Sequence, residues 1–305
     1  MAHIRFGLIL PAYGLTANMA NYVADVNRAL TLAAGHFDSI WMIDHLHDAP
    51  ESFTTLTYFA AQHPSFDFGH TVVCQSYRNP ALLAKMAATL QMLSDGRFTL
   101  GIGAGWHESE YHAYGYEFPS AGVRVAQLDE ALHVIKALWT QDEATFEGQH
   151  CCIHKAHCDP CPNPVPRVMV GAFGSKMLRL AARHADEWNV SSIGVARYRR
   201  LASEFARACA EVGRDPATVT RSWSGGCACA STLDEAKVLA GRRYGTDDED
   251  ECDFVGTPAM VVAQMQRFID AGVTTFMLDC AGFPDLSSLQ LTIDEILPEM
   301  LETYK

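Results

Sequence analysis

This sequence of 305 residues has little positive charge, no long hydrophobic run and no low-complexity linker. Its 23 lysines and arginines stand against 36 aspartates and glutamates, a formal net charge of -13 at pH 7. We therefore expect no nucleic-acid partner and no membrane partner, because no basic stripe is present to neutralise phosphates. The first apolar run stops at Pro11 after one arginine, which fits neither a signal peptide nor a spanning helix. A cytoplasmic protein is the expectation.

Ten cysteines are present, but they lack the arrangement of a disulfide-stapled domain. Small secreted domains place cysteines in loops, where disulfides stabilise a core that is too small by itself. Here most cysteines stand within apparent strands and helices, and 49% of all residues are hydrophobic. We predict mainly reduced thiols and a globular protein with a sizeable core.

The chain is organised around residues 79–106, which read NPALLAKMAATLQMLSDGRFTLGIGAGW. Asn79 and Pro80 are a typical N-cap and first helical residue, and apolar residues then recur at helical spacing. A strand follows Gly96 and ends in Gly103, Ala104, Gly105 and Trp106. Small residues at the carboxyl end of a strand allow a flat ligand to approach the backbone.

A strand, a few polar residues at its carboxyl end and a helix recur in this order along the whole chain. Eight strands are predicted, near residues 3–10, 36–46, 68–74, 98–103, 167–173, 186–192, 220–231 and 273–280. Parallel pairing through right-handed crossovers favours an α/β fold of the (β/α)8 TIM barrel type, and a doubly wound open sheet is the alternative. We interpret residues 141–166 as an insertion after the fourth barrel helix, within a single domain over residues 1–305.

Three segments, YRNPALLAKMAA, SDGRFTLGIGAGW and GYEFPSAGVR, follow one another in the chain. Together they resemble the bacterial luciferase-like superfamily, and within it the oxidoreductases that use the deazaflavin coenzyme F420. The resemblance runs from residue 6 to residue 278. It implies hydride transfer between F420 and a small organic substrate, and a homodimer. An FMN-dependent luciferase-like monooxygenase and a flavin-binding barrel protein without turnover stay open, since the superfamily contains both.

A parallel barrel binds its ligand at the carboxyl ends of its strands, which makes the strand tips the candidate site. Asp44 and His45 follow the second strand. An imidazole can pass a proton while a hydride moves, so His45 is the candidate catalytic residue. The resemblance implies that this pair borders the deazaflavin ring. A histidine that only caps a loop is the alternative, and we expect Asp44 to orient backbone or substrate groups.

The other candidate cofactor contacts are three clusters at strand ends. The first is Cys74, Gln75 and Ser76, where the resemblance implies a non-prolyl cis peptide that supports the ring. An ordinary strand end with a buried cysteine is the alternative. The second cluster begins a helix, where free amides and the helix dipole attract an anion such as the cofactor's phosphate. It comprises Gly171, Phe173, Gly174 and Ser175, and the third cluster is Gly103, Ala104, Gly105 and Trp106.

A rival site lies in the insertion, where seven possible zinc ligands stand close together. They are His150, Cys151, Cys152, His154, His157, Cys158 and Cys161. Thiolates and imidazoles at this spacing could form a tetrahedral zinc site and support a barrel hydrolase. The single Cys-x-x-Cys lacks a matching second pair, however, so we predict no metal site.

Trp106 generates the first prediction. Deazaflavin-dependent sugar-phosphate dehydrogenases carry a glutamate at this place, aligned on LGIGAGW, and its carboxyl donates a proton. Trp106 cannot deliver a proton, but it can wall the pocket or serve as a core anchor. We therefore expect no oxidation of glucose 6-phosphate in a cofactor-reduction assay. Brisk oxidation would contradict this interpretation of Trp106.

Overall fold

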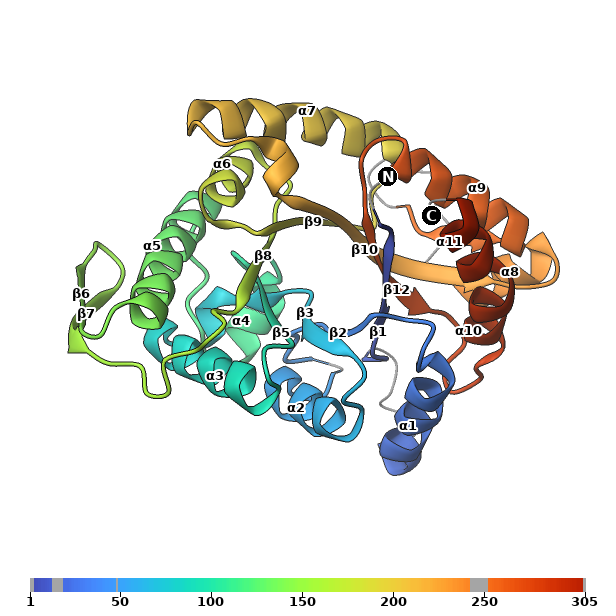
Figure 1. Ribbon diagram of the computed structural model, residues 1–305, viewed down its shortest axis with the longest axis horizontal. Helices are drawn as coiled ribbons and strands as arrows, with labels where there is room; N and C mark the ends of the chain where they lie inside the picture. The colour runs from blue at the N-terminus through green and yellow to red at the C-terminus, as the bar shows by residue number, and fades with distance from the viewer. Residues whose placement is uncertain (1–2, 13–18, 48, 242–251, 304–305) are drawn as a thin grey trace.

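The computed structural model describes residues 3–12, 19–47, 49–241 and 252–303. Eight parallel strands in this part of the chain close into a barrel (Figure 1). Each strand pairs with the next, and the last pairs with the first, so the doubly wound alternative is wrong and the TIM barrel is confirmed. The strands in order are β1 (Arg5–Ile9), β2 (Ser39–Met42), β3 (Asp67–His70), β5 (Phe98–Gly103), β8 (Arg167–Gly171), β9 (Glu187–Ser191), β10 (Thr220–Cys229) and β12 (Thr275–Cys280).

The barrel is filled by side chains from several strands. Trp41 lies in an apolar cluster with Ile9, Met169 and Met277. Its indole donates a hydrogen bond of 2.8 Å to the Ser39 hydroxyl. The neighbouring strand makes room with Gly69, where a Cβ would lie 2.6 Å from the indole ring. A parallel barrel is a packed core and not a pore, so a ligand has space only above this layer.

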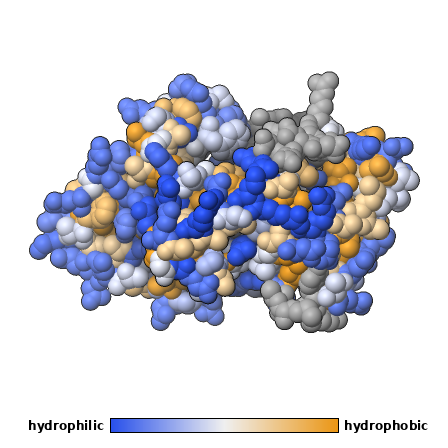
Figure 2. All heavy atoms as spheres, turned by 90° about the horizontal axis from the view of Figure 1, so that it is seen from above, coloured by the Kyte–Doolittle hydropathy of each residue, from blue (hydrophilic) through white to orange (hydrophobic). Residues whose placement is uncertain are grey.

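Helices cover the outside of the barrel (Figure 1). Buried side chains recur at helical spacing on α7 (Val195–Glu211), and Figure 2, which views the molecule from this side, shows hydrophilic side chains across the middle of the face. No helix within the described ranges is both long and apolar enough to cross a membrane. The other helices are α1 (Tyr22–Ala33), α2 (Ser52–Gln62), α3 (Pro80–Leu93), α4 (Glu108–Ala113), α5 (Ala121–Thr140), α6 (Ser175–His184), α8 (Leu233–Ala240), α9 (Pro258–Ile269), α10 (Ser287–Leu291) and α11 (Leu297–Thr303).

The organising stretch folds as predicted. The Asn79 side chain accepts hydrogen bonds from the backbone N–H groups of Ala81 and Leu82, which caps α3. Ser94 follows as the C-cap of α3, and β5 then ends at Gly103. The cap and the spacing of apolar residues are local signals, which explains why sequence alone was sufficient here.

Two segments differ from the prediction. The predicted strand over residues 68–74 is interrupted after His70 and resumes as β4 (Val73–Cys74), with a non-prolyl cis peptide at Thr71–Val72 between the two pieces. The second is the insertion predicted after the fourth barrel helix, which follows α5 and contains an antiparallel hairpin that the sequence did not specify, formed by β6 (Ala144–Glu147) and β7 (Cys152–Ala156). Short elements that the sequence analysis missed are α4, α8 and β11 (Phe254–Gly256).

Candidate active site

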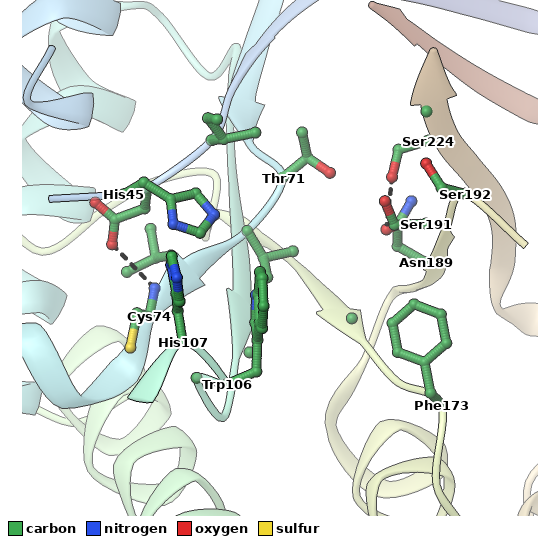
Figure 3. A pocket seen from close by; sticks show the side chains of 18 of the residues that line it. His45, Thr71, Cys74, Trp106, His107, Phe173, Asn189, Ser191, Ser192 and Ser224 are labelled. Carbon is green, nitrogen blue, oxygen red and sulfur yellow. Dashed lines mark hydrogen bonds between the residues drawn. The ribbon is translucent and has the colours of Figure 1, made fainter. Parts of the chain in front are cut away.

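A cavity of about 900 Å³ opens at the carboxyl ends of the barrel strands. Figure 3 shows two of its walls: His45, Cys74, Trp106 and His107 lie on one side, and Phe173, Asn189 and three serines lie on the other. Ten of the predicted site residues line it, namely Asp44, His45, Cys74, Gly103, Ala104, Gly105, Trp106, Gly171, Phe173 and Gly174. The strand tips therefore converge on one cavity, which is the arrangement that the barrel topology predicts.

His45 is held by a buried carboxylate. Its Nδ1 atom lies 2.9 Å from Oε1 of Glu110, whose side chain is only 1% exposed. The same carboxylate accepts hydrogen bonds from the backbone N–H of His47 at 3.1 Å and from the Tyr77 hydroxyl at 3.0 Å. Burial alone would raise the pKa of Glu110, but the His47 hydrogen bond and the nearby His45 hold it below its ordinary value.

An ionised Glu110 fixes the role of each nitrogen of the His45 ring. A carboxylate without a proton can only accept, so Nδ1 of His45 donates to it. Proton exchange with a ligand then falls to Nε2, as in other imidazole and carboxylate pairs. Glu110 stands on α4, an element that the sequence analysis missed, and only the three-dimensional contact identifies it as the partner of His45.

Trp106 stands at the mouth of the cavity. Its side chain is 71% exposed and its ring stacks on the ring of His107, with centroids 4.8 Å apart and an interplanar angle of 9°. The alternative interpretation of Trp106 as a core anchor is therefore wrong. His107 also brings Nδ1 to 3.4 Å from Oε1 of Glu110, so both imidazoles face the same carboxylate.

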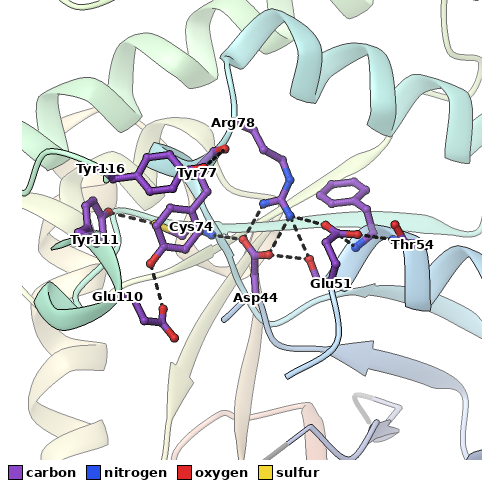
Figure 4. A network of polar contacts seen from close by, with 11 residues as sticks. Asp44, Glu51, Thr54, Cys74, Tyr77, Arg78, Glu110, Tyr111 and Tyr116 are labelled. Carbon is purple, nitrogen blue, oxygen red and sulfur yellow. Dashed lines mark hydrogen bonds and ion pairs between the residues drawn. The ribbon is translucent and has the colours of Figure 1, made fainter. Parts of the chain in front are cut away.

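Asp44 lies at the cavity wall, but its carboxylate is occupied by the protein itself (Figure 4). Arg78 binds both oxygens, at 2.7 and 2.9 Å. The Ser52 hydroxyl donates at 2.6 Å and the Cys74 backbone N–H at 2.9 Å. Burial alone would raise the pKa of Asp44, but the hydrogen bonds and charge of Arg78 and the Ser52 hydroxyl hold it below its ordinary value. Asp44 thus orients backbone and has no oxygen without a protein partner for a ligand.

Three predicted cofactor contacts lie off the cavity wall. The Gln75 side chain is buried and donates to Ser76 Oγ at 2.7 Å, so these two residues bond to each other. Ser175 is the first residue of α6, and it too is absent from the lining. The structure therefore places Gln75, Ser76 and Ser175 outside the set of residues that line the cavity, and their contact with a cofactor stays a prediction. Thr71, Val72 and Val73 line the cavity in their stead, because the strand is interrupted after His70.

The opposite end of the cavity carries the start of α6 and one cation. Gly174 is the N-cap of α6, no side chain caps this end, and a Cβ at Gly174 would meet no atom within 4 Å. Arg197 of α7 lines the cavity and lies 5.7 Å from the centroid of the Phe173 ring. Arg179 of α6 forms an ion pair with Glu211 at 3.1 Å. Backbone amides and a guanidinium are a suitable pair of groups for an anion.

The cysteines and histidines of the insertion do not converge. In the part of the chain that the structure describes, metal-ligating side chains come together as His45, His107 and Glu110, and as Asp129, His133 and His184. The thiols of Cys158 and Cys161 lie against backbone oxygens of Pro160 and Trp139. The zinc alternative for the insertion therefore has no support in its geometry.

The sequence of residues 5–250 matches the family described as "Luciferase-like monooxygenase". The chain belongs to this family. Family membership makes it a luciferase-like oxidoreductase, in agreement with the resemblance of the segments around residues 79–106.

Named relatives support the same assignment. The F420-dependent glucose-6-phosphate dehydrogenase of Kineococcus radiotolerans is 36% identical over 164 residues, which cover 51% of this chain and 48% of the relative. The phthiodiolone/phenolphthiodiolone dimycocerosates ketoreductase of Mycobacterium bovis BCG is 33% identical over 213 residues, which cover 60% and 55%. The chain thus spans about half the length of these luciferase-like relatives.

Solved luciferase-like structures share the fold. An F420-dependent secondary alcohol dehydrogenase with an F420-acetone adduct superposes with a TM-score of 0.82 at 21% identity, covering 96% of this chain and 98% of the other. The oxygenating constituent of 3,6-diketocamphane monooxygenase from Pseudomonas putida, in complex with FMN, gives 0.78 at 22% identity, covering 98% and 99%. At these identities the comparison establishes the barrel fold.

The Asp44 and Arg78 pair generates a prediction about stability. Asp44→Asn leaves the guanidinium of Arg78, 12% exposed, without its bidentate partner, and should destabilise the protein by about 3 to 5 kcal/mol in urea unfolding at pH 7. The half-exposed Glu51 pairs with the same guanidinium at 2.7 Å, so Glu51→Gln is the matched control and should lose at most about 1 kcal/mol.

The pH dependence of the free energy of unfolding is a second test of the Asp44 and Arg78 pair. Because the pKa of Asp44 is lowered in the folded protein, its stabilisation is complete above the unfolded value of about 3.9 and is lost as the pH falls through the folded value. The difference between parent and Asp44→Asn should therefore shrink in acid. A constant difference, or equal losses for Asp44→Asn and Glu51→Gln, would contradict the assigned role of this pair.

Proposed function

We propose that this protein is an F420-dependent oxidoreductase that transfers a hydride between the deazaflavin and a small, uncharged organic substrate. The observation that carries the proposal is the His45 and Glu110 pair on the wall of the strand-end cavity. The two relatives whose names specify an F420-dependent dehydrogenase and a ketoreductase support the choice of chemistry.

The cavity floor suits a flat ring. Val72 lies between the backbones of Gly103 and Gly171, where a Cβ would stand 2.8 and 3.4 Å from its Cγ2 atom. With glycine at both places, the backbone can approach the Val72 isopropyl group on both sides. An apolar group beside bare backbone fits the face of a deazaflavin, and the α6 start with Arg197 fits the anionic tail of the cofactor.

The residues of this chain hold the proton and limit the access of water. When bound, the deazaflavin supplies the atom that accepts or releases the hydride. His45 holds the accompanying proton at Nε2, and Glu110 stabilises the imidazolium through Nδ1. Trp106 and His107 stack at the mouth of the cavity and limit the access of water.

The charged side chains that line the cavity indicate the class of substrate. Arg197 is the only lysine or arginine among the described residues that line the cavity. If it serves the cofactor, a phosphorylated substrate has no cation of its own. The far wall instead offers the exposed hydroxyl of Ser191, which can donate to a carbonyl compound or accept from an alcohol, whereas the buried Asn189 amide is already bonded to the hydroxyls of Ser222 and Ser224.

Cofactor choice is tested by titrating the purified protein with F420 and with FMN while following fluorescence. We expect F420 to bind at least about tenfold more tightly, a difference of about 1.4 kcal/mol, because residues 77–106 most resemble the deazaflavin branch. Equal or reversed affinities would replace the proposal with the FMN-dependent monooxygenase. Tight F420 binding without redox change for any donor would favour a binding protein without turnover.

The proton path is tested by two substitutions and one control. His45→Ala should lower turnover of an accepted alcohol by about 10² to 10⁴, and Glu110→Gln by at least about tenfold, with F420 affinity within a few fold of the parent. Glu108→Gln is the matched control, because Glu108 is an exposed carboxylate in the same turn of α4 and lies off the cavity wall. Parent-like turnover in His45→Ala would remove His45 from this role.

A further inference from the structure

A second group of metal-ligating side chains lies outside the cavity, between two outer helices. Asp129 and His133 stand on α5 four residues apart, a spacing that places them on the same helical face. His184 is the last residue of α6. These three residues each bring one ligand atom within 4.8 Å of the others, and none of them lines the cavity.

The geometry of this group is already close to that of a metal site. Nε2 of His184 lies 2.9 Å from Oδ1 of Asp129. The rings of His133 and His184 have centroids 4.7 Å apart. Ligand atoms around a tetrahedral zinc ion stand about 3.3 Å from one another, so small side-chain rotations suffice to close the site.

We propose that Asp129, His133 and His184 bind a divalent transition-metal ion, with zinc as the best match to two imidazoles and a carboxylate. Three protein ligands leave a fourth position for water. The His133 ring stacks on Phe146 of the β6–β7 hairpin, with centroids 6.0 Å apart and an angle of 13°. The ion would therefore join α5 to α6 and fix the imidazole on which the hairpin rests. This inference is independent of the proposed function.

Two positively charged side chains near this group disfavour a bound metal ion, and removing one of them tests the proposal. Arg183 Nη2 donates to the same Asp129 oxygen at 2.9 Å, so its positive charge competes with a metal ion for the carboxylate. Lys136 donates to the backbone oxygen of His184 at 2.7 Å and adds positive charge nearby. The neighbouring Glu130 carboxylate offers little compensation, because it accepts three backbone N–H groups of the hairpin loop. Removal of Arg183 should therefore strengthen metal binding, the opposite of its effect on a plain ion-pair cluster.

The experiment titrates zinc by calorimetry and cobalt by visible absorption. All proteins carry His107→Ala, which removes one ligand of the cluster at the cavity. We expect one saturable site in this parent, at least about tenfold weaker zinc binding in His133→Ala, and several-fold tighter binding in Arg183→Ala. His154→Ala, on the exposed face of the hairpin, is the control and should match the parent. Because His133 is exposed, its loss should leave the fold intact.

Thermal unfolding provides a second readout. Zinc at a hundred times the Kd of the parent should raise the Tm of the parent by about 5 °C and that of His133→Ala by at most about half as much, because its binding is at least about tenfold weaker. Unchanged zinc affinity in His133→Ala, weaker binding in Arg183→Ala, or no saturable binding in the parent would each overturn the proposal. Loss of binding in Cys158→Ser or Cys161→Ser alone would assign the metal to the insertion and overturn it as well.

Discussion

The buried ion pair between Asp44 and Arg78 is the contact on which the active-site wall depends. Asp44 follows β2, Arg78 follows β4, and the same carboxylate holds the Ser52 hydroxyl at the start of α2 and the Cys74 N–H. The Asp44 side chain thus holds together the ends of β2 and β4 and the start of α2. Since a buried carboxylate is stable only with its partners, these segments must keep their relative positions for the protein to fold.

The His45 and Glu110 pair, which we propose to carry the proton, is built on that wall. His45 is adjacent to Asp44, and Glu110 reaches it from α4 after β5, with Tyr77 and the His47 N–H holding the carboxylate in place. Two separate networks therefore meet at His45. The first fixes the strand end that carries the ring, and the second fixes the orientation of the ring within the cavity. Asp44 thus holds the wall together, whereas the adjacent His45 presents its ring to the cavity.

Local signals predicted the barrel and most of its mouth, whereas long-range contacts escaped prediction. The Asn79 cap and the apolar spacing of α3 are encoded within a few residues, and strand tips converge because parallel strands all point the same way. The strand is interrupted after His70, and Thr71 and Val72 line the cavity whereas Gln75 and Ser76 do not. Glu110 contacts His45 across 65 residues, and Arg197 on α7 contacts Phe173 ahead of α6, separations over which residue spacing carries no information.

A crystal structure of the protein soaked with F420 tests the central claim most directly. We expect density for the deazaflavin ring within the strand-end cavity, in contact with Val72 and His45, with the anionic tail toward Gly174 and Arg197. The His45 and Glu110 hydrogen bond should persist in the complex. Density for the cofactor at any other place, or a ring that leaves His45 out of contact, would contradict the account.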